Sequence, residues 1–175
     1  KYEGYLKQQQ EEIEKFKKNE SVLIPRSDTE ILVEEAVRTL PRGARFVDLC
    51  TGSGCIAISV LAERPDTEAF AVEKFEKTLA LAQKNAAKNG VSERFSPMLA
   101  DVLEPLELPA GAVFDAILST PPYIAKRELA GLSPEVKAEP LAALDGGEDG
   151  LIFYRKILEL HTKHLSPDGM ILFEI

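Results

Sequence analysis

Asp48-Leu49-Cys50-Thr51-Gly52-Ser53-Gly54 says more about the fold of this chain than any other stretch. It joins an apolar run at 45–50, typical of a buried strand, to a helical pattern from Cys55 to Glu63. Two glycines allow the backbone to turn sharply and to approach a ligand closely, and the N-terminus of the following helix presents free N–H groups. A tight turn without a ligand is the alternative. However, acidic, small and glycine residues gather here at the one place where α/β sheets bind cofactors.

Strands and helices alternate along the rest of the chain. Upstream, Ser27 and Glu30 have the spacing of a capping box at the start of a helix that Pro41 ends. Downstream, the pattern predicts strands at 69–73, 95–100, 114–119 and 170–175, helices at 76–89 and 149–165, and a turn at 167–169. The alternation predicts an α/β fold: a Rossmann-like, doubly wound and mainly parallel sheet. Such a sheet binds its ligand beyond the carboxyl ends of its strands.

The composition is that of one soluble globular domain. The chain has 175 residues, of which 45% are hydrophobic and 29% charged, and this length can bury a core without disulfides. No apolar run approaches the ~20 residues of a membrane span, and residues 1–20 lack the apolar stretch of a secretory signal. Cys50 and Cys55 suggest neither a disulfide framework nor a metal cluster. We therefore expect a cytoplasmic protein without a metal.

The formal net charge is −8. Proteins that bind nucleic acid non-specifically usually carry a basic face, because neutralising phosphates supplies much of their affinity. Apart from Lys15, Lys17 and Lys18, the basic residues are scattered along the chain. The charge therefore disfavours a nucleic-acid substrate, and we expect a monomer.

Acidic residues at the strand ends indicate which cofactor is bound. Gly52-x-Gly54-x-x-Ala57 satisfies the dinucleotide fingerprint, and Glu73 could accept both hydroxyls of a ribose, which suits NAD and S-adenosylmethionine equally. Asp48 favours S-adenosylmethionine because a methionine ammonium needs a carboxylate there, and Asp101 is placed to accept from an adenine amino group. A solvated strand end and a turn cap are the alternatives for Glu73 and Asp101. The predicted cofactor-binding residues are Asp48, Cys50, Thr51, Gly52, Ser53, Gly54, Glu73, Asp101, Val102 and Thr120.

The motif Ser119-Thr120-Pro121-Pro122-Tyr123 follows the fourth predicted strand. Two prolines stiffen the backbone and remove two N–H donors, so the carbonyls of Thr120 and Pro121 could face a substrate amino or amide group. Tyr123 offers a flat ring to a planar acceptor. A stiff loop is the alternative, but the position after a strand of a cofactor-binding sheet favours function. The predicted catalytic residues are Thr120, Pro121, Pro122 and Tyr123.

These stretches together resemble the HemK (PrmC) family of glutamine-N5 methyltransferases, which act on peptide-chain release factors. The resemblance rests on 23–30, 48–57 and 119–124, and on Glu139-Pro140-Leu141-Ala142-Ala143-Leu144-Asp145-Gly146-Gly147-Glu148-Asp149-Gly150-Leu151. It implies that S-adenosylmethionine binds the glycine loop and leaves as S-adenosylhomocysteine. It further implies that the motif at 120–123 holds the amide of a glutamine in a release-factor loop, which receives the methyl group.

Three features depart from the family pattern. Thr120 stands where the family has Asn, and the family's helical domain could be represented only by residues 1–20, a polar linker or helix. The catalytic domain is expected at 21–175, without the last strands of the family sheet. Thr120 supports one alternative, a catalytically impaired S-adenosylmethionine-binding domain. Others are an adenine or guanine N-methyltransferase, which shares a Pro-Pro-aromatic motif, and a nicotinamide oxidoreductase.

Overall fold

A computed structural model describes residues 27–133, 136 and 140–175. The expected polar segment at 1–20 lies outside the described residues, as do positions 23–26 and Glu139 of the family-like stretches. The side chain of Ser27 is also outside them, so the capping box stays a prediction.

Five parallel strands form one sheet. Its order, β3-β2-β1-β4-β5, places β1 at the centre, paired with β2 on one side and β4 on the other. The chain proceeds outward from β1 to β3 and then crosses to β4, so the order reverses between β1 and β4. The strands are β1 (Arg45–Leu49), β2 (Glu68–Glu73), β3 (Phe95–Leu99), β4 (Phe114–Ser119) and β5 (Leu165–Phe173).

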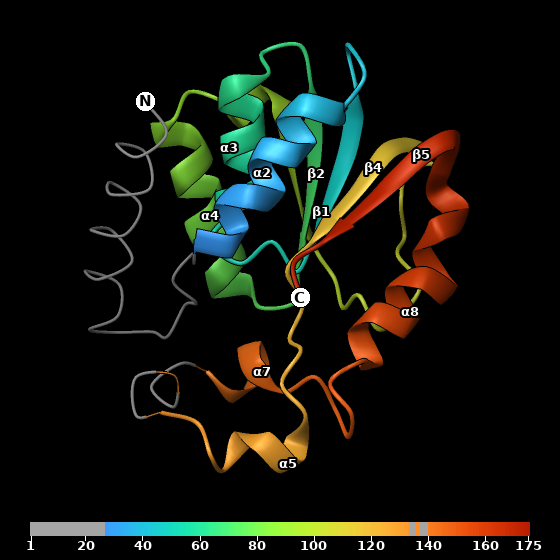
Figure 1. The fold of residues 1–175 in the computed structure, drawn as a ribbon. Coiled ribbons are helices and arrows are strands. Elements are labelled where there is room, and N and C mark those ends of the chain that lie inside the picture. The colour runs from blue at the N-terminus through green and yellow to red at the C-terminus, as the bar shows by residue number, and fades with distance from the viewer. Residues whose placement is uncertain (1–26, 134–135, 137–139) are drawn as a thin grey trace.

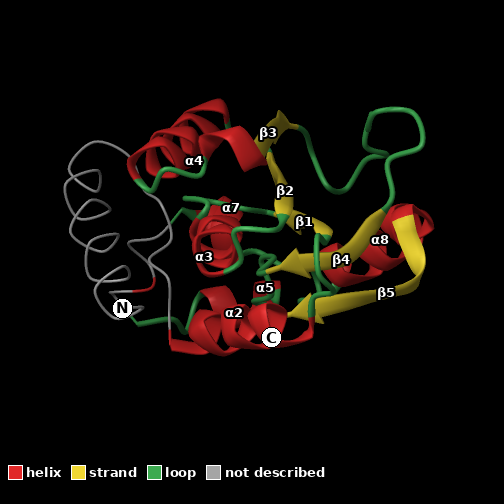
Figure 2. Ribbon diagram, turned by 90° about the horizontal axis from the view of Figure 1, so that it is seen from above, coloured by secondary structure: helices red, strands yellow, loops and turns green. Residues whose placement is uncertain are grey.

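Helices cover both faces of the sheet. Figure 1 shows α2, α3 and α4 on one face and α8 on the other, with α5 and α7 beyond the strand ends where the chain continues. Figure 2 shows the same layers from above. The helices are α2 (Ser27–Thr39), α3 (Cys55–Glu63), α4 (Glu76–Lys88), α5 (Lys126–Leu129), α7 (Leu141–Leu144) and α8 (Ile152–His161), with 3-10 turns η1 (Ser92–Arg94) and η2 (Thr162–His164).

Alternating side chains of the strands fill two cores. On β1, Phe46 packs among α2, α3 and α4, whereas Val47 and Leu49 pack on the opposite face with Ile157 of α8. All four are buried, as expected for a central parallel strand that is covered on both sides. The predicted α/β fold is confirmed.

Two predicted boundaries at the C-terminal end were wrong. The helix expected at 149–165 begins only at Ile152 and continues as η2 after His161, because Gly150 has a φ of +78°, outside the helical region. The strand expected at 170–175 begins at Leu165. The predicted turn at 167–169 is an irregularity within that strand, because Leu165 pairs with Phe114 and Met170 pairs with Ala116.

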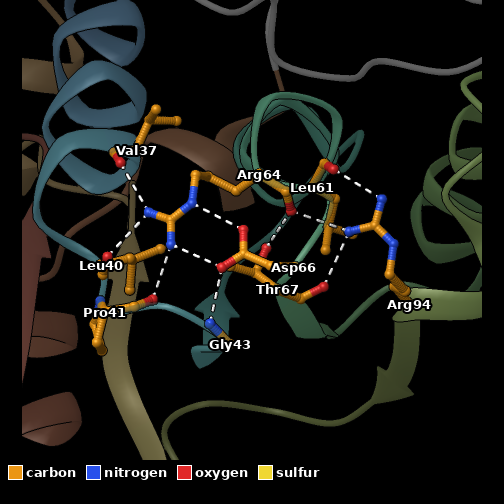
Figure 3. A network of polar contacts seen from close by, with 9 residues as sticks. All are labelled: Val37, Leu40, Pro41, Gly43, Leu61, Arg64, Asp66, Thr67 and Arg94. Carbon is orange, nitrogen blue, oxygen red and sulfur yellow. Dashed lines mark hydrogen bonds and ion pairs between the residues drawn. The ribbon is translucent and has the colours of Figure 1, made fainter.

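Two arginines tie helix ends together at the amino end of the sheet, as Figure 3 shows. Arg64 donates to the carbonyls of Val37, Leu40 and Pro41, which lie in the last turn of α2 and just after it. Arg94 donates to the carbonyls of Leu61, Arg64 and Thr67, which lie between the last turn of α3 and the start of β2. Asp66 pairs with Arg64 and accepts the N–H of Gly43.

Candidate active site

The loop after β1 forms a tight turn beside β2. Gly52 and Gly54 have φ of +58° and +81°, and Cys50 has +62°, which side chains rarely adopt. The N–H of Thr51 donates to the carbonyl of Val72 at 2.9 Å, so the loop is joined to the neighbouring strand. The loop leads directly into α3, whose N-cap is Gly54. The sequence prediction of a glycine turn between strand and helix is confirmed.

Gly54 also sets the distance between α3 and α4. A Cβ atom here would lie 2.8 Å from Cδ1 of Ile58 and 3.2 Å from Cβ of Ala82 on α4. The carbonyl of Ser53 accepts from the buried amide of Asn85 on α4 at 2.9 Å. The loop is thus held by α4 as well as by β2, which keeps its N–H groups in a fixed place.

Asp48 is completely buried at the end of β1. Its Oδ2 accepts from the hydroxyl of Thr51 at 2.6 Å and from the N–H of Ala57 at 3.2 Å. Its Oδ1 has no hydrogen-bond partner. Burial raises the pKa of Asp48 to about 7, although the Thr51 and Ala57 bonds oppose this. One oxygen therefore braces the loop, and the other is an acceptor without a donor, as a site for a ligand ammonium would require.

Glu73 faces the loop from the end of β2 and is 7% exposed. Its Oε2 accepts the N–H of Gly52 and its Oε1 the N–H of Phe75, both at 3.0 Å. Burial raises the pKa of Glu73, while these N–H groups act in the opposite direction. The backbone N–H of Lys74 also acts on this carboxylate. A carboxylate has about four acceptor positions, so acceptor capacity remains for a ribose hydroxyl.

Asp101 lies just beyond β3 and pairs with Lys74, the neighbour of Glu73. The ammonium of Lys74 is 2.8 Å from Oδ2, and Oδ1 accepts the N–H of Leu103 at 3.0 Å. Burial acts to raise the pKa of Asp101, but these partners hold it below its ordinary value. The ion pair of Lys74 with Asp101 was not predicted from the sequence. The position of Lys74, directly after Glu73 at the end of a strand, could have indicated it.

Val102 is buried in the core on the α8 face of the sheet. Its carbonyl is 2.8 Å from Nε2 of His161, which is itself buried at the end of α8. The side chain of Val102 therefore packs in the core. The predicted contact of Val102 with a cofactor stays a prediction, and it would have to come from the backbone of this residue.

The motif at 119–123 begins where β4 meets the end of β1. The hydroxyl of Ser119 donates to the carbonyl of Leu49 at 2.6 Å, so the motif and the glycine loop leave adjoining strands at one level. Pro121 and Pro122 are buried, and Thr120 and Tyr123 are half-buried. In the described part of the chain, no backbone N–H bonds to the carbonyl of Thr120 or Pro121.

The end of β5 lies beside the same site. The hydroxyl of Thr29 on α2 donates to the carboxylate of Glu174 at 2.6 Å, and both residues are buried. The N–H of Glu174 donates to the carbonyl of Ser119 at 3.1 Å, and its carbonyl accepts from the hydroxyl of Tyr154 at 2.9 Å. Sequence reasoning missed these contacts, which join residues up to 145 positions apart.

The described residues contain no group of three or more His, Cys, Asp or Glu side chains that could hold a metal ion. Cys50 and Cys55 are free thiols there, and burial raises the pKa of both, that of Cys55 to about 12. Within the same ranges, no helix is both long and apolar enough to span a membrane.

Comparison with solved structures places the fold. A methyltransferase subunit of a type I restriction-modification system from Streptococcus thermophilus aligns with a TM-score of 0.61 and 22% identity, over 87% of this chain and 34% of that one. A methyltransferase from Thiobacillus denitrificans, solved with S-adenosylhomocysteine, aligns with a TM-score of 0.54 and 17% identity, over 85% and 48%. The fold is that of the Rossmann-like, class I S-adenosylmethionine-dependent methyltransferases.

Sequence comparison identifies the family. Residues 27–139 match the family described as "Methyltransferase small domain", and the chain belongs to that family. A release factor glutamine methyltransferase from Geobacter sulfurreducens is 44% identical over 89% of this chain and 53% of its own length. One from Thermodesulfovibrio yellowstonii is 42% identical over 92% and 58%. The chain spans about half the length of these relatives. The resemblance to the HemK family is confirmed. Two further predictions are confirmed for the family: methyltransferase activity, and S-adenosylmethionine as its cofactor.

Proposed function

We propose that this chain carries the catalytic site of an enzyme that methylates the side-chain amide of a glutamine in peptide-chain release factors. The observation that carries the proposal is the bond between Ser119 and the carbonyl of Leu49. Because of this bond the Thr120–Tyr123 motif follows β4 beside the loop that follows β1, which supports adjoining sites for the methyl donor and the acceptor. The substrate follows the names of the relatives at 42–44% identity.

The residues fit S-adenosylmethionine in three places. Oδ1 of Asp48 would accept the methionine ammonium, and Glu73 would accept the ribose hydroxyls beside the N–H groups of the glycine loop. Asp101 and the turn at Val102 would hold the adenine. When bound, S-adenosylmethionine supplies a methyl group on a positively charged sulfur, which is a good leaving group.

The motif would prepare the glutamine amide for attack. The amide nitrogen is a poor nucleophile because its lone pair is delocalised into the carbonyl. The carbonyls of Thr120 and Pro121 would accept hydrogen bonds from the two amide N–H groups and turn the lone pair toward the methyl group. Methylation would form an N–C bond, leave the electron pair of the donor's C–S bond on sulfur, and release one proton from the nitrogen to water. Positioning of this kind contributes several kcal/mol to a reaction barrier.

A protein glutamine suits this site better than a nucleic-acid base. The formal net charge is −8, whereas phosphate binding depends on basic side chains. We infer that the partner is the glutamine-bearing loop of a release factor, and that the enzyme acts as a cytoplasmic monomer.

The proposal is tested by incubating the chain with S-adenosylmethionine and a release factor, and mapping methylation by mass spectrometry. We expect one methyl group on a glutamine side chain and none on an RNA or DNA oligomer. Methylation of the oligomer alone would contradict the proposal.

Thr120→Asn is the most informative variant in this assay. An Asn side chain can both donate to and accept from an amide, whereas a Thr hydroxyl is shorter and has a single donor. We expect Thr120→Asn to raise kcat by about 10²-fold, the size of one well-placed polar contact to a reacting group. Affinity for S-adenosylhomocysteine should change little, because the substitution keeps the backbone carbonyl of residue 120 and leaves the glycine loop, Glu73 and Asp101 as they are. Equal rates would show that the backbone alone orients the amide.

A further inference from the structure

The loop at 145–150 lies directly against the backbone of the Thr120–Tyr123 motif. The N–H of Ile124 donates to the carbonyl of Leu144, and the N–H of Gly146 donates back to the carbonyl of Ile124, both at 2.9 Å. Ile124 and Asp145 thereby form an isolated parallel bridge. The N–H of Lys126 then donates to the carbonyl of Gly147 at 2.9 Å. The residues that follow the motif are thus paired to this loop like two short strands.

Two glycines of the loop leave no room for a side chain. A Cβ on Gly146 would lie 2.8 Å from both Cα and the carbonyl carbon of Tyr123. A Cβ on Gly150 would overlap the carbonyl oxygen of Tyr123. These neighbours are backbone atoms in a stretch that two buried prolines stiffen, so they cannot rotate away as a side chain would. Any side chain at these positions must therefore move the motif or the loop.

The loop is itself fixed at both ends. Oδ1 of Asp145 accepts the N–H of Gly147 at 2.8 Å, which closes a tight turn. The N–H of Ile152, the first residue of α8, donates to the carbonyl of Gly146 at 3.2 Å. The loop therefore connects the motif to α8, in addition to the direct connection of the motif to β4.

We propose that Gly146 is a positioning residue for methyl transfer, because it lets the 145–150 loop hold the Thr120–Tyr123 backbone at the one distance that suits the acceptor amide. This inference rests on the proposed function for its catalytic consequence. The other proposed cofactor-binding residues lie on different elements: at the end of β1 and in the loop after it, at the end of β2, and just beyond β3. A displacement of about 1 Å in a reacting group can lower a rate about 10²-fold.

Gly146→Ala tests the contact without adding backbone strain, because Gly146, unlike Gly147 and Gly150, does not have a positive φ. We expect kcat for glutamine methylation to fall about 10²-fold, with a smaller change in KM and unchanged affinity for S-adenosylhomocysteine. Hydrogen exchange provides a readout without turnover. The N–H groups of Ile124 and Lys126 should exchange faster in the variant than in the original chain.

Two glycines outside the loop supply controls. Gly43→Ala strains a residue with a φ of +72° at the opposite end of the sheet, where a Cβ meets nothing within 4 Å. It should lower the melting temperature yet leave kcat unchanged. Gly131→Ala, which has neither a positive φ nor a close contact, should leave both unchanged.

Asp145→Ala is the second test if Gly146→Ala fails to fold, since it loosens the turn without a clash. We expect a fall in kcat in the same direction. Unchanged kcat and unchanged exchange in a folded Gly146→Ala or Asp145→Ala variant would overturn the inference. Should the original chain methylate no glutamine, the proposed function fails. The exchange measurement would still decide whether Gly146 holds the motif in place.

Discussion

Asp48 carries a carboxylate without contact to solvent at the end of β1. Its carboxylate is buried, one oxygen has no partner, and its pKa is raised to about 7. A ligand ammonium beside Oδ1 would favour the ionised form and lower this pKa. With a pKa of about 7, Asp48 would be partly protonated in the free protein at neutral pH and less so with an ammonium beside Oδ1. On the proposed binding mode, cofactor binding releases protons from this residue.

We predict that affinity for S-adenosylhomocysteine rises as the pH increases from about 5 to 7 and changes less above 7. The sign follows because the bound state holds fewer protons than the free state, so removing protons from solution favours binding. Isothermal titration calorimetry in two buffers of different ionisation enthalpy would measure the proton release at pH 7.

Asp48→Asn is the control, because its amide does not titrate. It should bind more weakly and lose most of the pH dependence in that interval. Glu73, whose pKa burial also raises, contributes in the same direction and accounts for what remains. Equal pH profiles for Asp48→Asn and the original chain would place the ammonium away from Asp48.

The arginine network at the amino ends of the strands (Figure 3) acts at the scale of whole elements. Arg94 donates to three carbonyls, those of Leu61, Arg64 and Thr67, which belong to the end of α3 and the turn into β2. Because α3 begins at the glycine loop, its other end is fixed far from any ligand. We therefore expect the network to stabilise α3 without affecting the site.

Arg94→Ala should lower the free energy of unfolding by roughly 2–3 kcal/mol, since a charged donor is lost from partly buried carbonyls. Urea denaturation would measure this, and affinity for S-adenosylhomocysteine should be unchanged in the folded protein. Arg38→Ala is the matched control, because Arg38 pairs with Glu35 on an exposed surface of α2. It should show no measurable loss. A weakened cofactor affinity in Arg94→Ala would show that α3 transmits strain to the loop.

At this scale, local sequence patterns predicted most elements. The strand at 114–119 and the helix from Cys55 to Glu63 lie where expected, because apolar runs and glycine turns act over a few residues. The ends of α8 and β5 differ from the predicted ones. Gly150 has a positive φ and lies against the carbonyl of Tyr123, and the β5 irregularity depends on pairing with β4. Contacts of this kind join distant segments, and no local pattern contains them.

Within the site, sequence reasoning predicted the residues that end strands, but not those that hold them. Asp48, Glu73 and Thr120 could be proposed because the carboxyl ends of parallel strands meet at one edge. The role of each as a cofactor or substrate contact stays a prediction. Lys74 was missed, and Thr29 and Gly146 were included in the family-like stretches without a role, because each acts through a partner that only the folded chain brings near.

Across the whole molecule, Glu174 connects the first described helix to the last strand. Its carboxylate accepts from Thr29 of α2, its N–H donates to the carbonyl of Ser119 at the end of β4, and its carbonyl accepts from Tyr154 of α8. Both helical layers and strand β4 therefore meet at one residue beside the Thr120–Tyr123 motif. We expect this junction to stabilise the sheet and to keep the motif in line with the glycine loop.

A double-mutant cycle with Thr29→Val and Glu174→Gln tests the junction. Thr29→Val removes the donor but keeps the shape of the side chain, and it leaves a buried acceptor with one bond fewer. We expect a loss of roughly 1.5–3 kcal/mol in the free energy of unfolding, the value of a hydrogen bond to a charged group. A coupling energy of about 0.5–3 kcal/mol in the cycle, from urea denaturation, would show that the two side chains interact directly. If the two losses simply add, the 2.6 Å bond between the two side chains contributes nothing to stability.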